Sequence, residues 1–386
     1  MAHYFDHNAT TPVSAEVLEA FVPMLSGSFG NASSIHAFGQ EARQKMEAAR
    51  REVAELLGCD PKEIVFTSGG TEADNLAIFG VLRREGLAGR HIITTAIEHP
   101  AVLNTCIELE REGAAVSILR VGSDGVVDPD DVRRTLRPET VLISVMHANN
   151  ETGAIQPLTE IASLAREAGA LFHSDGVQAA GRLPAKVRDL GVDLYSISGH
   201  KLYAPKGMGA LYVRDGVKLH PMLFGGRHER ERRAGTENAP GAVALGAACA
   251  WINHNVHEEG ARLDGLRDRL EQGIQQRVPH VRVNSASAPR TPNTTNIEFE
   301  GIEGEALVIA LDLAGFAVST GAACSSGAVQ PSHVLTAMGR SAAEAKATIR
   351  FSLGRSNDAA QVDALIDAVR ASVSRLRKLS PTYSHV

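Results

Sequence analysis

The chain has 386 residues, of which 44% are hydrophobic and 22% charged, the composition of a globular protein with room for two or three domains. Its formal net charge of −6 argues against a broad electrostatic attraction to nucleic acid. The first residues show no basic segment followed by an apolar run, and no apolar run of about 18 residues occurs, so we expect a cytoplasmic protein. The four cysteines lack paired spacing, which predicts neither a metal site nor a disulfide framework.

Short runs rich in Ile, Val and Leu alternate with amphipathic segments in the first two thirds of the chain. This pattern is typical of buried parallel strands joined by helices, and it indicates the α/β class. The predicted strands are 63–67, 91–95, 115–119, 141–146, 171–174, 194–197 and 209–213, and the predicted helices between them include 72–84, 101–112 and 159–168.

The pattern changes near residue 256, where we place a domain boundary. A polar helical segment and a loop rich in Ser, Pro and Asn come first, and a smaller α+β domain follows. Its predicted elements are a helix at 258–277, a loop at 285–293, a strand at 295–300, a helix at 303–314, a loop around Cys324, a helix at 332–337, a strand at 348–352 and a helix at 358–376.

Two polar residues follow buried strands of the predicted sheet. Asp175 ends one strand, and Lys201 comes after another within Ser-Gly-His-Lys. Ligands of open α/β sheets bind outside the carboxyl ends of the strands, so both side chains can face one crevice. Pyridoxal 5′-phosphate needs a lysine for its Schiff base and a carboxylate beside its pyridine nitrogen. The alternatives are a surface lysine and an aspartate that caps the next helix, but the polar segment between two apolar strands favours the cofactor.

Two further segments follow strands in the same way. Gly70 and Thr71 begin a predicted helix, where backbone N–H groups and a hydroxyl would bind a phosphate, although an ordinary helix start looks similar. His99 follows the strand 91–95, and its imidazole can stack on a pyridine ring and move protons near neutral pH. A solvated loop histidine is the alternative interpretation.

Cys324 lies among small residues in Ser-Thr-Gly-Ala-Ala-Cys-Ser-Ser-Gly, which predicts a mobile loop and an accessible thiol. A buried, inert thiol suits Cys106 and Cys249 better. Arg350 has apolar neighbours on both sides, so it requires a carboxylate partner. That partner is either a structural ion pair or the carboxylate of an amino-acid substrate, and the residue pattern leaves both open.

These segments belong to an ordered series of motifs that spans nearly the whole chain: DHNATTP, NASSIHAFG, IVFTSGGTEADNLAI, EHPAVL, MHANNETGAIQPL, HSDGVQAAG, SGHKLYAPKG, GGRHERERRAGTEN, TGAACSSGAVQPSHVL and IRFSLG. In this series the chain resembles the NifS/IscS class of cysteine desulfurases. The resemblance implies a fold-type-I transferase dependent on pyridoxal phosphate, with a mostly parallel seven-stranded sheet in its large domain. It further implies a large cofactor-binding domain at 15–256, a small domain formed by 1–14 and 257–386 that carries the catalytic cysteine loop, and a homodimer.

The resemblance also assigns roles to individual residues. Lys201 looks like the Schiff-base lysine, Asp175 like the partner of the pyridine nitrogen, and Cys324 like the sulfur acceptor on a long loop. The other implied roles are cofactor binding by His99, Asn150 and Gln178, phosphate binding by Gly70, Thr71, Ser198, His200 and the other subunit's Thr236, and substrate binding by Asn31, Asn150 and Arg350.

The implied reaction removes sulfur from L-cysteine, releases L-alanine and leaves a persulfide on Cys324 for an iron–sulfur scaffold or another sulfur acceptor. A selenocysteine lyase or an aminotransferase on the same fold is the nearest alternative. A metal hydrolase using His147, His173 and His200 finds no support in ligand spacing. A non-catalytic scaffold would not need lysine, aspartate, histidine and cysteine together.

Overall fold

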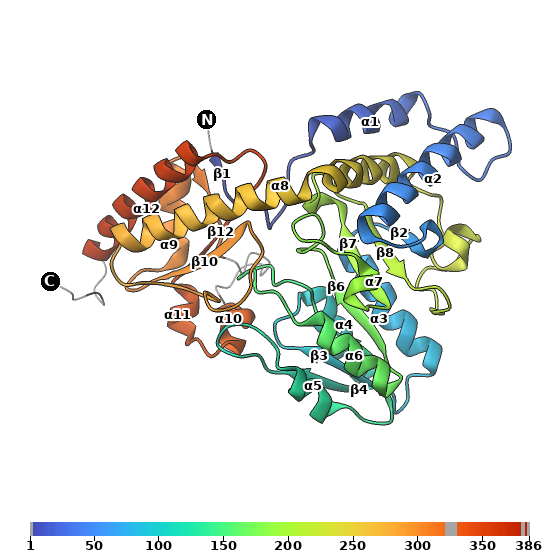
Figure 1. The fold of residues 1–386 in the computed structure, drawn as a ribbon, viewed down its shortest axis with the longest axis horizontal. Coiled ribbons are helices and arrows are strands. Elements are labelled where there is room, and N and C mark those ends of the chain that lie inside the picture. Colours follow the sequence, from blue (N-terminus) through green and yellow to red (C-terminus); the bar gives the residue numbers. More distant parts are fainter. Residues whose placement is uncertain (1–2, 321–329, 380–382, 384–386) are drawn as a thin grey trace.

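The computed structural model of the chain describes residues 3–320, 330–379 and 383. Two bodies lie next to each other along the long axis, and helix α8 (Ala239–Arg277) runs from one into the other (Figure 1). The large body surrounds a wide sheet. The small body combines the carboxyl-terminal elements with strand β1 (His3–Tyr4). None of the described helices is long and apolar enough to span a membrane.

The sheet of the large body has seven strands in the order β2-β8-β7-β6-β5-β3-β4. Strand β8 is antiparallel to both of its neighbours, and all other pairings are parallel. The predicted α/β class with a mostly parallel sheet is therefore confirmed. The strands are β2 (Ile64–Thr67), β3 (His91–Thr95), β4 (Ala115–Leu119), β5 (Thr140–Ser144), β6 (Leu171–Asp175), β7 (Leu194–Ser198) and β8 (Gly209–Val213).

Helices cover both faces of this sheet, which explains why its strands appear in the sequence as continuous apolar runs. Successive side chains point to opposite faces: Ile92 packs in the cluster formed with α3 and α4, and Ile93 packs in the cluster formed with α2, α6 and α8. The helical elements are α1 (Ala15–Ser26), α2 (Ala37–Leu57), α3 (Gly70–Glu85), α4 (Pro100–Arg111), α5 (Pro129–Thr135), α6 (Leu158–Ala168), α7 (Val187–Leu190) and the 3₁₀ turns η1 (Pro61–Glu63), η2 (Gly199–Lys201) and η3 (His228–Glu231).

The small body has an antiparallel sheet in the order β12-β10-β9 and a hydrophobic cluster of its own. Strand β1, near the amino terminus, pairs with β11 and so joins the carboxyl third of the chain. The strands and helices predicted after residue 290 are confirmed to within a few residues. The elements are β9 (Val281–Val283), β10 (Thr294–Phe299), β11 (Phe316–Ala317), β12 (Thr348–Ser352), α9 (Gly304–Leu313), α10 (His333–Ala337), α11 (Ala342–Lys346) and α12 (Ala359–Leu379).

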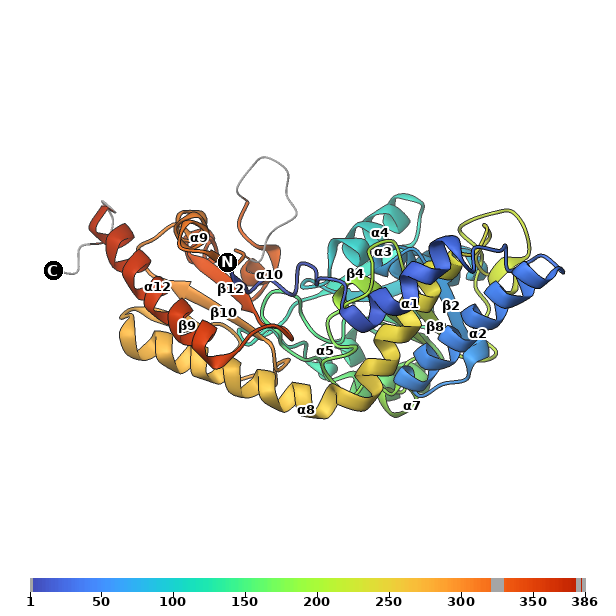
Figure 2. The same cartoon turned by 90° about the horizontal axis from the view of Figure 1, so that it is seen from above.

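Helix α8 joins the two bodies without a break (Figure 2). Leu245 and Ile252 in its first half pack in the large body, and Leu270 and Ile274 in its second half pack in the small body. The predicted helix 258–277 is therefore only the second half of a longer one. The first half has small, apolar residues on most sides, so it lacks the polar stripe that marks an amphipathic helix. The predicted boundary near residue 256 falls inside α8, and the division into domains stays a prediction.

Candidate active site

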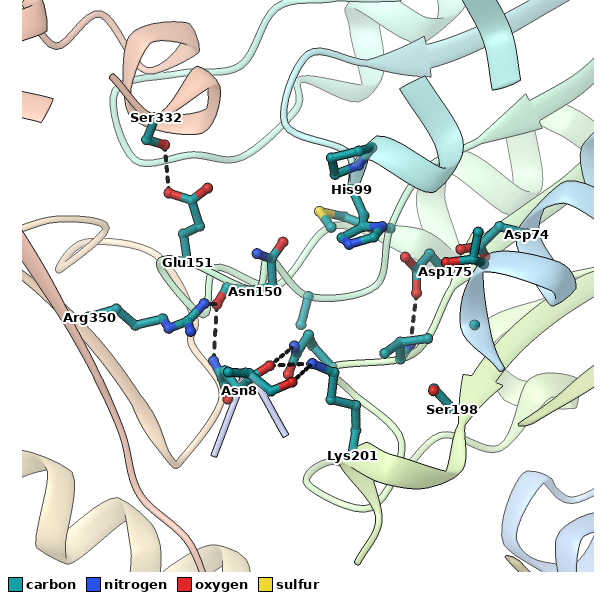
Figure 3. Close-up of a pocket in the computed structure, with 18 of the residues that line it drawn as sticks. Asn8, Asp74, His99, Asn150, Glu151, Asp175, Ser198, Lys201, Ser332 and Arg350 are labelled. Carbon is teal, nitrogen blue, oxygen red and sulfur yellow. Dashed lines mark hydrogen bonds between the residues drawn. The ribbon is translucent and has the colours of Figure 1, made fainter. Parts of the chain in front are cut away.

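A pocket of about 570 Å³, called the main pocket below, opens at the carboxyl edge of the large sheet, and the small body closes its other side. Its size suits a cofactor or other small molecule. In Figure 3, Lys201 and Arg350 reach toward Asn8 from opposite sides. The predicted residues that line the main pocket are Gly70, Thr71, His99, Asn150, Asp175, Gln178, Ser198, His200, Lys201 and Arg350.

Lys201 enters the main pocket from the turn η2, immediately after strand β7. Its Nζ atom donates hydrogen bonds to the main-chain carbonyls of Asn8 at 2.5 Å and Ala9 at 2.6 Å. Burial and, to a lesser extent, the neighbouring arginines Arg182 and Arg350 together lower the pKa of Lys201 to about 7. A large fraction of the amine is therefore uncharged near neutral pH, as a nucleophile or base requires.

Asp175 is the last residue of strand β6, and its Oδ1 accepts the N–H of Val177 at 2.9 Å. A second buried carboxyl, Asp74 of α3, lies next to it (Figure 3). Burial raises the pKa of Asp175 to about 7, and the proximity of Asp74 adds to this rise. A cationic group bound in front of Asp175 would reverse the effect, because an opposite charge favours the carboxylate.

The start of helix α3 forms the end of the main pocket nearest Ser198. The cap residue Gly69 has no side chain to bond the first-turn N–H groups, so those of Gly70 and Thr71 stay available for an anion. A Cβ at Gly70 would lie 2.8 Å from Val177 Cγ2, so this close approach requires glycine. Burial lowers the pKa of His200 to about 4, and its neutral ring can donate one N–H.

His99 caps helix α4, since its Nδ1 atom accepts the N–H of Ala101 at 3.1 Å. In the neutral ring the proton therefore resides on Nε2. Burial lowers the pKa of His99, which keeps the neutral form dominant. The imidazole consequently presents a donor at the main pocket and can exchange that proton with a ligand.

Arg350 comes from the middle of strand β12 and is buried. Its Nη2 atom pairs with Asp6 Oδ1 at 2.7 Å, and its Nη1 atom donates to the carbonyl of Asn150 at 3.1 Å. Of the two interpretations left open by the sequence, the ion pair is thus observed. The Nε atom of Arg350 is buried and has no hydrogen-bond partner among the described residues, so the side chain keeps a donor for a ligand.

The sequence interpretation assigned no role to several residues of the main pocket. Asn8 is one of them: its carbonyl accepts from Gln178 Nε2 at 3.0 Å as well as from Lys201. The amide of Gln178 is thereby held with its Oε1 atom buried, and this atom has no partner within the described part of the chain. The motif Asp-His-Asn-Ala-Thr-Thr-Pro near the amino terminus could have drawn attention to Asn8. Its proximity to Lys201, however, is visible only in the folded chain.

A buried hydrogen bond joins the two walls of the main pocket. Ser332 Oγ donates to Glu151 Oε2 at 2.5 Å, and both side chains are buried. The same hydroxyl accepts the N–H of Leu335 at 3.1 Å and so caps helix α10. Burial raises the pKa of Glu151. These residues were also missed, because neither lies at the end of an apolar strand in the sequence.

Two of the predicted residues that the structure describes do not line the main pocket. Asn31 and Thr236 are exposed and lie outside its lining. Cys324, with its predicted mobile loop, lies outside the described residues.

The histidines of the hydrolase alternative do not converge. Each ring contacts a different hydroxyl: His147 that of Tyr195, His173 those of Ser144 and Ser196, and His200 that of Thr10.

Residues 3–365 match the aminotransferase class-V family. The chain is 49% identical to a cysteine desulfurase of Gluconacetobacter diazotrophicus, over 98% of this chain and 95% of that protein. Among solved structures, a NifS-like protein has a TM-score of 0.91 and 36% identity, covering 97% of this chain and all of that one. SspA, solved in complex with cysteine, has a TM-score of 0.81 and 38% identity over 91% of this chain and 98% of that chain. The chain therefore belongs to the cysteine desulfurases of the class-V aminotransferase family.

Proposed function

We propose that the chain, with pyridoxal 5′-phosphate on Lys201, removes sulfur from L-cysteine and passes it through Cys324 to an iron–sulfur scaffold or another acceptor in the cytoplasm. The observation that carries this proposal is the pair of Lys201 and Asp175 in the main pocket, with an amine whose pKa is lowered to about 7. The same site thus offers a nucleophilic amine and a carboxyl group whose ionised form a cationic partner would stabilise.

The residues present fit this cofactor. Asp175 would face the pyridine nitrogen, the start of α3 would hold the phosphate with Ser198 and His200, and His99 would lie against the ring. The proposal is supported by the buried Oε1 atom of Gln178, which lacks a partner among residues 3–320, 330–379 and 383 and could accept a hydrogen bond from a ligand. When bound, the ring would stabilise negative charge on the substrate's Cα atom.

The remaining steps belong to the chain's own side chains. The Lys201 amine would take the proton from Cα, Arg350 would orient the substrate carboxylate, and His99 would exchange protons with the substrate thiol. The thiolate of Cys324 would then attack the substrate sulfur. The carbon–sulfur bond breaks as the new sulfur–sulfur bond forms, so cysteine plus a thiol gives alanine plus a persulfide without an external oxidant.

The other cysteines are poor candidates for the sulfur acceptor. Burial raises the pKa of the Cys59 and Cys106 thiols to about 12, and it raises the pKa of Cys249 as well. The thiolate is the nucleophilic form, so these three residues would react slowly at neutral pH.

We also propose a homodimer. The segment between α1 and α2 exposes Phe29 and Ile35, the first turn of α2 exposes Phe38, and Ile35 is 93% exposed. Neighbouring apolar side chains of this size mark an interface. A second copy would also account for Asn31 and Thr236, which are exposed and lie outside the main pocket of their own chain. Sedimentation equilibrium at micromolar concentration should give twice the mass of the chain, and a monomer would refute the assembly.

The proposed activity is tested by adding L-cysteine to the purified protein and measuring alanine, absorption and peptide masses. We expect a visible band that changes with cysteine, and the mass of one extra sulfur atom on the peptide containing Cys324. Cys324→Ser should abolish the added mass and alanine formation, while Cys59→Ser, the matched control, should retain both. Full cysteine-dependent turnover by Cys324→Ser would disprove the assignment. Measuring alanine release from selenocysteine in parallel distinguishes a cysteine desulfurase from the selenocysteine lyase alternative.

A further inference from the structure

A second, smaller cavity lies behind Lys201, and we call it the rear cavity. It is lined by His7, Arg182, Lys201, Tyr203 and other residues, among them Trp251 and Arg355. Of the residues that the structure describes, Lys201 alone lines both this cavity and the main pocket. The groups that line the rear cavity therefore lie close to the lysine without lining the main pocket themselves.

Arg182 differs from the other arginines around Lys201, because no ion pair joins it to a carboxylate in the described part of the chain. Its Nη1 atom donates to the carbonyl of Gln178 at 3.0 Å. The arginines nearby are neutralised: Arg350 by Asp6 at 2.7 Å and Arg355 by Glu16 at 2.6 Å.

The remaining groups of the rear cavity do not supply the missing negative charge. Glu259, its one acidic side chain, is paired with Arg262 at 2.8 Å. Burial and Arg182 together lower the pKa of His7 to about 4, so its ring is neutral. The Tyr203 hydroxyl accepts the N–H of Arg355 at 2.8 Å, and burial raises the pKa of this phenol. Burial lowers the pKa of Arg182 only to about 10, so the guanidinium remains charged at neutral pH.

We propose that Arg182 is a positioning residue that acts through Lys201: its unneutralised charge in the rear cavity disfavours the ammonium form of the lysine. Lys201 is thus kept ready to attach the cofactor and to accept the Cα proton. This inference rests on the proposed function for the role of Lys201, but the charge effect exists in the protein without any ligand.

The charged and titratable groups around Lys201 support this view. Burial is the largest cause of its lowered pKa, followed by Arg182 and then Arg350, whereas Asp6 and Asp175 act in the opposite direction. His99 and His200 also interact with Lys201, and the pKa of each is lowered, so they contribute little positive charge. Asp6 offsets Arg350, which leaves Arg182 as the uncompensated neighbour.

The test uses the full-length apoenzyme and measures the pH dependence of acetylation at Lys201 with a small excess of acetic anhydride, read by peptide mass spectrometry. Two variants separate charge from hydrogen bonding. Arg182→Gln keeps a donor for the Gln178 carbonyl but removes the charge, and Arg182→Lys keeps the charge. Lys62, an exposed lysine paired with Asp215, is the internal reference.

In the wild type, Lys201 should label with a midpoint near pH 7, far below that of Lys62. Arg182→Gln should raise the midpoint by at least about one pH unit, equivalent to about fivefold less free amine at pH 7, and Arg182→Lys should not. An unchanged midpoint in Arg182→Gln would overturn the proposal, as would equal shifts in both variants. Because labelling needs neither cofactor nor cysteine, it fails or succeeds independently of the desulfurase activity.

Discussion

The Nζ atom of Lys201 lies 2.5 Å from the main-chain oxygen of Asn8, although most of the large body's sequence lies between the two residues. The side chain of Asn8 fixes that oxygen from the other direction. Its Nδ2 atom donates to Thr294 Oγ1 at 2.9 Å and to the carbonyl of Asn150 at 3.1 Å, and its Oδ1 atom accepts from Asn293 at 3.1 Å. The amino-terminal segment thus connects the reactive lysine to strand β10 of the small body.

Asn8→Ala should weaken both the fold and cofactor binding. It leaves buried partners unpaired, which typically costs about 1–3 kcal/mol in the free energy of unfolding. It also removes the side-chain bonds that hold the main-chain carbonyl of residue 8 in place beside Lys201. Urea unfolding of the apoenzyme and titration with pyridoxal phosphate measure the two effects. Asn253→Ala removes a longer bond, 3.4 Å to the carbonyl of Glu52, outside the main pocket, and should bind cofactor normally. Equal cofactor affinity in both variants would contradict this prediction.

Arg350→Lys should raise KM for cysteine by about tenfold to a hundredfold, since a charge-assisted hydrogen bond contributes about 1.5–3 kcal/mol. Lysine keeps the charge opposite Asp6 but loses the planar fork. Steady-state kinetics measure KM, and the visible spectrum should stay normal because, under the proposed function, other residues would hold the pyridine ring. An unchanged KM would mean that Arg350 serves only in its ion pair.

Ser332→Ala should raise KM and also destabilise the protein, because it removes both the bond to Glu151 and the cap of α10. The loss of a cap alone costs about 0.5–2 kcal/mol. Ser341 provides the matched control, since it caps α11 in the same way but does not line the main pocket. Ser341→Ala should therefore lower stability and leave KM unchanged. If both variants changed KM equally, the Ser332–Glu151 bond would have no specific part in the site.

Glu98 should make the apoenzyme less stable as the pH rises. Burial raises its pKa from the ordinary 4.5 to about 8, so the folded state holds the proton more tightly than the unfolded state. Its stabilising contribution is complete below about pH 4.5 and is lost as the pH approaches 8. Glu98→Gln keeps an acceptor for Thr95 and Met146 but does not titrate.

Relative to this variant, the wild type should lose unfolding free energy between about pH 5 and pH 8, as measured by urea titration at each pH. Glu108→Gln, at an exposed position, should follow the wild type at every pH. Parallel curves for wild type and Glu98→Gln would show that Glu98 is not buried as a carboxylic acid.

Much of the large sheet could be predicted from the sequence, because strands buried on both faces need continuous apolar runs. Lys201, Asp175 and His99 were recognisable as pocket residues for a related reason, since each is polar and lies at the end of such a run or a few residues after it. Helix α2 was not predicted, and the start of α8 was placed too late. Asn8 and Glu151 escaped notice because their importance arises from pairing with distant segments, which neither periodicity nor local composition encodes.

The continuous α8 also affects the entropy of substrate recognition. By helical rise its 39 residues extend roughly 58 Å, and rotating one body against the other would require breaking main-chain hydrogen bonds within it. The separation between Lys201 in one body and Arg350 in the other is therefore set before an amino acid arrives. An amino acid bound as proposed between these residues would lose little conformational freedom to domain closure, so more of the interaction energy would remain for discrimination between thiol-bearing and other amino acids.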